Sequence, residues 1–329
     1  MLDGTPPVAG TADRSLSIIV AVMGGKTAVL HIGTHKTGNT SLQTMIAGNV
    51  RWFDDQGLYY PSAGRGSGDG HHNVAWELNG DERYDPAGGS TADLVLELEQ
   101  VQAQSVLLSS EDFEYLYRRP ANLARLRQAL EQLGYAIRVL VVVRQPAEYV
   151  ESLYSELRKH GLVESLDDFV DRALEEGGVV FGQWDFRVDY HQLLSGFAAV
   201  FGARVVHVLP YDSTNSVGSV LAASGRLLRL RLAPVHEWER WNARQSTPGT
   251  SVTNSSSIGD APDRIGLTAS RISLTAAERE SIEATFSRSA GLAANGTGPR
   301  PFGRVARLGR FATDMRGSTD TSVGAVTTP

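Results

Sequence analysis

The chain has 329 residues, of which 41% are hydrophobic and 21% charged, a balance that is ordinary for a folded protein with a large apolar core. Its formal net charge of -6 provides no overall positive field for a polyanion, so we expect no nucleic-acid partner. It contains no cysteine, which excludes disulfides, thiolate metal sites and a cysteine nucleophile.

Residues 15–25 form an apolar run that is too short to span a membrane, and the segment before it lacks the basic start of a secretory signal. We therefore expect a cytoplasmic protein without a transmembrane segment. We interpret residues 1–22 as an extension outside the core and residues 23–299 as a single α/β domain. Residues 300–329 have little to bury and are expected to form a flexible tail.

The first half of the domain alternates apolar strands with helices. Its first strand, 27–33 (TAVLHIG), ends at a glycine, and the helical spacing of Leu42, Met45 and Ile46 follows it. The other predicted elements are a short strand within 56–64, helices at 91–103 and 120–132, and buried strands at 105–110 and 136–143.

The second half continues the alternation. A helix is expected from Pro146 to Gly161, which are typical start and stop residues. We predict an amphipathic helix over 185–202, a buried strand over 203–210, and a late helix over 274–290 that is capped by Ser273 or Thr275. Unbroken apolar strands alternating with helices indicate an α/β fold, with a parallel sheet flanked by helices on both faces.

A glycine-rich loop joins the first strand to its helix. Gly33-Thr-His-Lys-Thr-Gly38-Asn39-Thr40 matches the P-loop spacing G-x-x-x-x-G-x-[ST], so we expect the sheet to be P-loop-NTPase-like. The residue after the second glycine is Asn39 instead of lysine, and the lysine lies earlier, at Lys36. The backbone N–H groups and the positive end of the following helix can still enclose a phosphate. His35, beside this loop, is interpreted as a packing or hydrogen-bonding residue.

A second pair of candidate phosphate-binding residues follows the strand 136–143. Arg144 comes directly after this strand, and Ser152 lies eight residues later on the next helix. An arginine at the carboxyl end of a strand offers a bidentate fork, and together with the serine it can bind a second phosphate. The glycine-rich loop and this pair together indicate a ligand with phosphate groups at two separate places.

The sequence resembles the sulfotransferases that use 3'-phosphoadenosine 5'-phosphosulfate (PAPS). HIGTHKTGNTSLQ, residues 31–43, is similar to their 5'-phosphosulfate loop, and VVVRQPAEYVESLYSE, residues 141–156, is similar to their 3'-phosphate motif R-x-P-x-x-x-x-x-S. The order of the stretches VLLSSEDFEYL, VDYHQLL and FGARVVHVLPYD also agrees with that family, so the resemblance covers about 27–225. The departure is Asn39, where the family commonly has threonine.

The resemblance implies a role for each matching residue. Lys36 would stabilise charge on the bridging oxygen as the sulfuryl group leaves, and Arg144 and Ser152 would bind the 3'-phosphate. The 5'-phosphosulfate would be bound through backbone and hydroxyl groups by Thr37, Gly38, Asn39, Thr40 and Ser41. The cosubstrate would be PAPS, with no metal required.

The general base is the least determined part of the predicted site. In the family it is a histidine or a glutamate, often near the end of the strand that precedes the 3'-phosphate strand, which nominates Glu111 here. His71 and His72 are the alternatives, as base or substrate contacts, and Asp112 is a weaker candidate. We therefore predict sulfuryl transfer from PAPS to a hydroxyl on a carbohydrate, glycolipid or other small metabolite.

Two other functions stay open. One is a P-loop nucleotide kinase or NTPase, although the strands at 105–110 and 136–143 lead into serine and arginine instead of a Mg²⁺-binding aspartate. The other is a catalytically degenerate protein that binds PAPS or its product without transfer.

Overall fold

A computed structural model describes residues 25–66, 68–235, 237, 271, 273–286 and 306–307. None of the helices in this part of the chain combines the length and the hydrophobicity that a membrane span needs. The predicted extension 1–22 and the predicted tail 300–329, apart from residues 306–307, lie outside the described residues, as does the domain boundary at 299.

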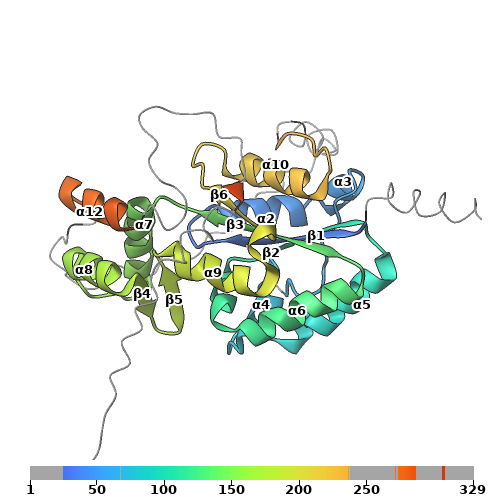
Figure 1. The fold of residues 1–329 in the computed structure, drawn as a ribbon, viewed down its shortest axis with the longest axis horizontal. Helices are drawn as coiled ribbons and strands as arrows, with labels where there is room; N and C mark the ends of the chain where they lie inside the picture. The colour runs from blue at the N-terminus through green and yellow to red at the C-terminus, as the bar shows by residue number, and fades with distance from the viewer. Residues whose placement is uncertain are drawn as a thin grey trace, which may run out of the picture.

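A central sheet organises the fold (Figure 1). Its strands, in the order β2-β1-β3-β6-β7, are β2 (Ser105–Ser109), β1 (Thr27–Gly33), β3 (Ala136–Val143), β6 (Val206–Pro210) and β7 (Ala306–Arg307). The first four are parallel, and β7 pairs antiparallel with β6 at one edge. The predicted α/β class with a parallel sheet is therefore confirmed.

Both faces of this sheet are buried. Along β3, Val139 and Val141 face one hydrophobic cluster, whereas Leu140 and Val142 face the other, as the period-2 geometry of a strand requires. In Figure 1, helices α2, α3 and α10 cover one face and helices α4, α5, α6 and α9 cover the other. The bounds are α2 (Asn39–Ala47), α3 (Val50–Asp54), α4 (His72–Asn79), α5 (Thr91–Val101), α6 (Pro120–Gln132), α9 (Tyr190–Phe201) and α10 (Ser216–Leu228).

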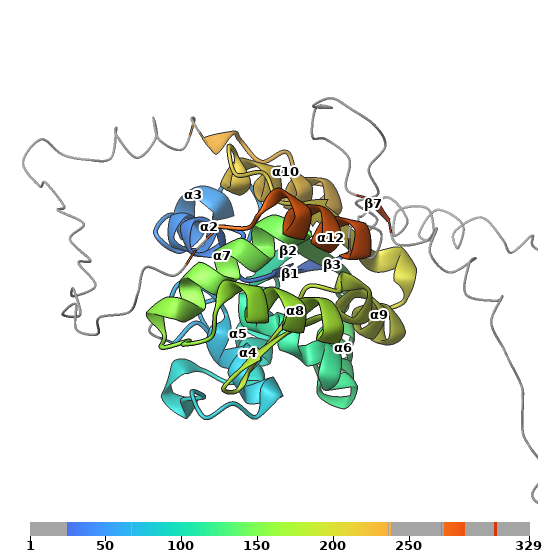
Figure 2. The same cartoon turned by 90° about the vertical axis from the view of Figure 1, so that its left-hand side faces the viewer.

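A further group of elements lies in front of the strand ends (Figure 2). It consists of α7 (Pro146–Lys159), α8 (Leu166–Glu176), α12 (Ala276–Phe286) and the antiparallel hairpin of β4 (Gly178–Phe181) and β5 (Trp184–Arg187). Three short 3-10 helices complete the described part: η1 (Pro86–Gly88), η2 (Glu111–Arg118) and η3 (Ala203–Val205). Thr275 caps α12, as predicted, because its hydroxyl accepts from the Glu278 N–H while the Glu278 carboxylate accepts from the Thr275 N–H.

Two predicted elements differ from the structure. The helix predicted over 185–202 begins only at Tyr190, where Asp189 caps it, because the preceding residues pair as β5 across a turn at Gly182, whose φ is 60°. Within 56–64 there is no regular strand in the described structure, only a bridge between Tyr59 and Val106.

The packing beneath the glycine loop generates a first prediction. A Cβ on Gly33 would lie 1.7 Å from Oδ1 of Asn39, so Gly33→Ala forces the Asn39 side chain out of its place. We expect overpacking of this kind to lower the free energy of unfolding by about 1–3 kcal/mol in chemical denaturation. Gly25→Ala is the control, because a Cβ there would meet nothing within 4 Å. Equal stability of both variants would contradict this packing.

Candidate active site

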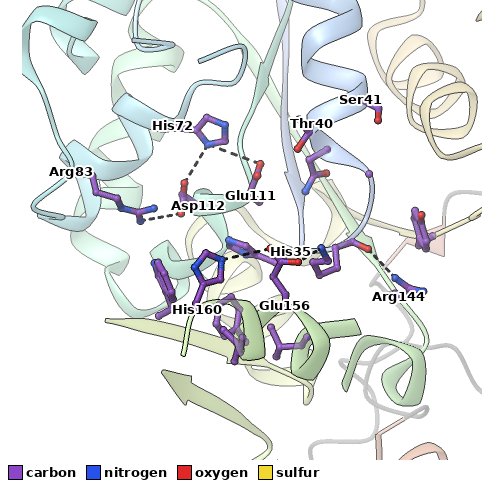
Figure 3. Close-up of a pocket in the computed structure, with 18 of the residues that line it drawn as sticks. His35, Thr40, Ser41, His72, Arg83, Glu111, Asp112, Arg144, Glu156 and His160 are labelled. Carbon is purple, nitrogen blue, oxygen red and sulfur yellow. Dashed lines mark hydrogen bonds and ion pairs between the residues drawn. The ribbon is translucent and has the colours of Figure 1, made fainter. Parts of the chain in front are cut away.

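The carboxyl ends of the parallel strands meet at one edge of the sheet. β1 pairs with β2 on one side and with β3 on the other, so the chain leaves the end of β1 at a topological switch point, where α/β folds bind their ligands. A cavity of about 690 Å³ lies here. Figure 3 shows residues from α2, α4, η2 and α7 around it.

The glycine loop, residues 34–38, forms one wall of this cavity. Gly38 caps α2 in the left-handed conformation with φ of 77°, and Lys36 also has a positive φ of 65°. Gly38 has no side chain to cap the first N–H groups of α2, and no acidic residue lies in the first turn of that helix. These N–H groups and the helix dipole therefore form an anion-binding end. Thr40 and Ser41 line the cavity from the first turn of α2.

Thr37 and Asn39 stabilise the loop from its buried side. The Thr37 hydroxyl donates to the Thr34 carbonyl at 2.6 Å. The Asn39 side-chain nitrogen donates to the carbonyls of Gly33 and Thr34, both at 3.2 Å. The residue that departs from the family motif thus uses its amide inside the loop, and its predicted contact with a ligand would rest on its backbone N–H.

Lys36 extends from the loop to α7. Its Nζ lies 2.9 Å from Oε2 of Glu156, which also accepts from Lys159 at 3.0 Å. The hydrogen bond from Lys36, followed by that from Lys159, outweighs the opposing effect of burial and lowers the pKa of Glu156 to about 2. Glu156 was not singled out from the sequence. The available signal was its position four residues after Ser152, on the same face of the predicted helix.

Arg144 approaches the loop from the end of β3. Its Nη1 donates to the carbonyl of Lys36 at 3.3 Å, and its guanidinium lies 5.2 Å from the ring centroid of Tyr211. Arg144, Lys36 and Tyr211 all line the cavity. Ser152 is half-buried on α7 and does not line the cavity in the described structure, so its contact with a phosphate stays a prediction.

Glu111 and His72 lie together on the opposite wall (Figure 3). The Gln43 amide of α2 donates to Oε2 of Glu111 at 3.0 Å, and His72 Nδ1 lies 4.0 Å from the same oxygen. Burial alone lowers the pKa of His72, but the hydrogen bond with Asp112 and the charge of Glu111 outweigh it, so this pKa is raised.

Asp112 contacts three side chains of this wall. Its buried carboxylate accepts from Trp76 Nε1 at 2.9 Å and from Arg83 Nη2 at 3.2 Å, and it lies 3.2 Å from His72 Nδ1. Burial raises the pKa of Asp112, but the His72 hydrogen bond and the nearby charges of His35 and Arg83 outweigh it and lower the pKa to about 2. Asp112 therefore fixes His72 and Arg83, and the sequence-based ranking underestimated its part in the site.

The structure places His71 away from the cavity, in contrast to His72. The ring of His71 is fully buried, with Nε2 3.1 Å from the Pro61 carbonyl and Nδ1 accepting from the Ser109 N–H at 3.1 Å. Burial lowers its pKa to about 3. Because both nitrogens are engaged with the backbone, this geometry does not favour the predicted role of His71 as a base.

The hydrogen-bonding role expected for His35 is confirmed, whereas sequence reasoning missed two aromatic residues of the cavity wall. His35 lines the cavity beside Lys36 and forms a short pair with buried Glu114. Trp184 and Phe186 of β5 also line the cavity. Phe186 was hidden because its segment, 185–202, was interpreted as a helix, and Trp184, directly before that segment, was not singled out.

Comparison with solved structures finds distant similarity. No protein-family model matches the chain, and no curated protein matches it. A sulfotransferase from Alicyclobacillus acidocaldarius gives a TM-score of 0.42 at 14% identity, over 67% of this chain and 92% of that one. A mouse sulfotransferase complexed with PAP gives 0.36 at 13% identity, over 66% of this chain and 64% of that one. A structure of the PezAT toxin-antitoxin system of Streptococcus pneumoniae gives a TM-score of 0.26 at 15% identity, over 70% of this chain and 93% of that one. Similarities this weak support no argument about function, so the chemistry must be argued from the residues of the site.

Replacing the Asp112 carboxylate tests its structural role. Asp112→Asn turns an amide nitrogen toward one of the donors that surround Asp112, so we expect a loss of about 3 kcal/mol in the free energy of unfolding at pH 7. Exposed Asp171 on α8 is the control position, as Asp171→Asn.

The pH dependence has a defined sign. The pKa of Asp112 is 3.8 in the unfolded chain and about 2 in the folded chain. Its contribution to the free energy of unfolding is therefore present above about pH 4 and is lost as the pH falls toward 2. Asp112→Asn should flatten this part of the stability curve measured by denaturation, and an unchanged curve would contradict the assignment.

Proposed function

We propose that this protein is a sulfotransferase that transfers a sulfuryl group from PAPS to an acceptor hydroxyl. The acceptor is expected on a carbohydrate, a glycolipid or another small metabolite. The single observation that supports the proposal most is the convergence of two phosphate-binding elements on one cavity. The glycine loop with Lys36 and the strand-end residue Arg144 line it together, and they touch through the hydrogen bond from Arg144 to the Lys36 carbonyl.

The residues present fit a ligand with phosphates at two places. The start of α2, where no side chain caps the helix, offers N–H donors to a phosphosulfate, and Thr40 and Ser41 offer hydroxyls in the same turn. The Arg144 guanidinium is suited to bind a second phosphate beside Tyr211, because arginine binds phosphate in a bidentate manner. Bound PAPS would supply the activated sulfuryl group.

Lys36 is the residue proposed to stabilise the leaving group. Its ion pair with Glu156 joins part-buried side chains that are 34% and 30% exposed, and Lys159 donates to the same carboxylate oxygen, so Glu156 keeps a cationic partner when Lys36 turns away. Lys36 can therefore exchange Glu156 for an anion at little cost. A cation placed where negative charge develops lowers the barrier to transfer.

Glu111 is the proposed general base, with His72 as the alternative. Both line the cavity on the wall opposite α7, and Gln43 orients the Glu111 carboxylate. In-line transfer requires that the acceptor oxygen lose its proton as it bonds to sulfur, and a carboxylate at hydrogen-bonding distance can take that proton.

Calorimetric titration with adenosine 3',5'-bisphosphate tests the function. We expect micromolar binding without metal, and Arg144→Ala should weaken it roughly thirtyfold, or about 2 kcal/mol, by removing the contact with the 3'-phosphate. The affinity for adenosine 5'-phosphate, which lacks the 3'-phosphate, should fall much less in Arg144→Ala. Arg125→Ala, at an exposed site on α6, is the control. Selective binding of Mg-ATP would support the nucleotide kinase or NTPase alternative instead, and bisphosphate binding with no transfer to any acceptor would indicate a degenerate binding protein.

The choice of base has its own test. Glu111→Gln keeps the shape of the side chain but removes the proton acceptor, so we expect the turnover number to fall about a hundredfold with little change in bisphosphate affinity. His72→Asn should slow transfer less. If Glu111→Gln turns over at the wild-type rate while His72→Asn does not, the base is His72.

A further inference from the structure

His35 forms an ionic pair with a buried glutamate inside the wall of the cavity. Its Nδ1 lies 2.7 Å from Oε1 of Glu114, whose side chain is only 4% exposed. The His35 side chain itself is 24% exposed and lines the cavity directly beside Lys36. The pair thus connects the glycine loop with the 3-10 helix η2, which begins at the proposed base Glu111.

Aromatic side chains fix the orientation of the ring. The rings of His35 and Phe186 form an edge-to-face pair, with a centroid distance of 5.0 Å and an interplanar angle of 83°. Tyr115 lies on another side with its centroid at 5.6 Å, and its hydroxyl is 3.5 Å from Nε2 of His35. His35 therefore has little rotational freedom, in contrast to Lys36 with its long flexible side chain.

The charges around this ring favour its protonated form. η2 provides most of the titratable groups near the pair, and α4, α7 and α9 provide the rest: Glu111, Asp112, Glu114, Tyr115, His72, Tyr149 and Tyr190. A buried carboxylate needs a positive or donating partner, and the hydrogen bond to Glu114 is best satisfied by an imidazolium. Burial alone lowers the pKa of His35, but Glu114, then Asp112 and Glu111, outweigh it and raise the pKa to about 9.

We propose that His35, kept as an imidazolium by Glu114, is a fixed second cation of the phosphosulfate loop and contributes a catalytic charge next to Lys36. This inference rests on the proposed function, because it assigns His35 to the same transferred group. With Nδ1–H donating to Glu114, Nε2 carries the second proton and lies 3.5 Å from the Tyr115 hydroxyl, so the positive charge of the ring acts on the cavity beside Lys36 electrostatically. The structure therefore divides the charge between a mobile cation, Lys36, and an oriented one, His35.

The first experiment measures protonation without any turnover. Histidine side-chain NMR of the full chain, with His35→Gln to assign the signal, should show His35 losing its proton near pH 9, whereas an ordinary histidine does so near 6.5. His31 and His71, whose pKa values burial lowers to about 3, should stay neutral over the same range. Glu114→Gln removes the carboxylate and should move the titration of His35 down to 6.5 or below.

The second experiment measures catalysis. His35→Gln should lower the turnover number about a hundredfold, the scale of losing one charge-stabilising donor. It should change the affinity for adenosine 3',5'-bisphosphate, which lacks the sulfuryl group, by less than about threefold. In the wild type, the rate should fall as the pH rises through about 9, and Glu114→Gln should shift this fall to lower pH. Exposed His191 on α9 is the control position, and His191→Gln should leave the profile unchanged.

The outcomes separate this inference from the proposed function. A wild-type His35 that titrates at or below 6.5, or a His35→Gln variant with the wild-type turnover number, overturns the inference even where the bisphosphate binds. If Glu114→Gln does not fold, the wild-type titration and His35→Gln still decide the question. A chain that binds no bisphosphate while His35 titrates near 9 contradicts the proposed function, and with it the catalytic role of this cation.

Discussion

The parallel register of β1 between β2 and β3 is the constraint on which the whole site depends. Pairing of His31 with Ser109, and of Gly33 with Val142, places the ends of three strands at one edge. Three parts of the site begin there: the glycine loop after β1, η2 after β2, and Arg144 after β3. Buried residues on both faces of the sheet prevent a slip, because a shift by one residue would turn each apolar side chain to the other face.

Ion pairing determines how the charges of the cavity are arranged in this structure. Lys36 is paired with Glu156, His35 with Glu114, and Arg83 with Asp112. These pairs differ in burial, since the Lys36 pair is about one third exposed, whereas Glu114 and Asp112 are 4% and 5% exposed. An exposed pair opens easily and a buried one does not. The cavity thus combines a cation that can move to a ligand with carboxylates that hold their partners in place.

Local patterns in the sequence were sufficient where a motif and its element coincide. The glycine loop was predictable because strand, glycine spacing and helix follow one another without interruption, and Arg144 was predictable because it ends the most strand-like segment of the chain. The hairpin of β4 and β5 was missed, since two four-residue strands have too little periodicity to be distinguished from the start of a helix. His71 and His72 are adjacent in sequence, and only the packing shows that one ring is buried against the backbone while the other lines the cavity.

The sequence by itself therefore determined the α/β class, the loop with Lys36 and the position of Arg144, because short-range periodicity and glycine spacing encode a strand-loop-helix unit. Only the tertiary structure decided the partners of each charge. Glu114 is 79 residues from His35 and Glu156 is 120 residues from Lys36, and no local pattern relates residues so far apart. Their contacts arise from the register of the parallel strands and from the burial of the helices that pack across the strand ends, which are properties of the assembled fold.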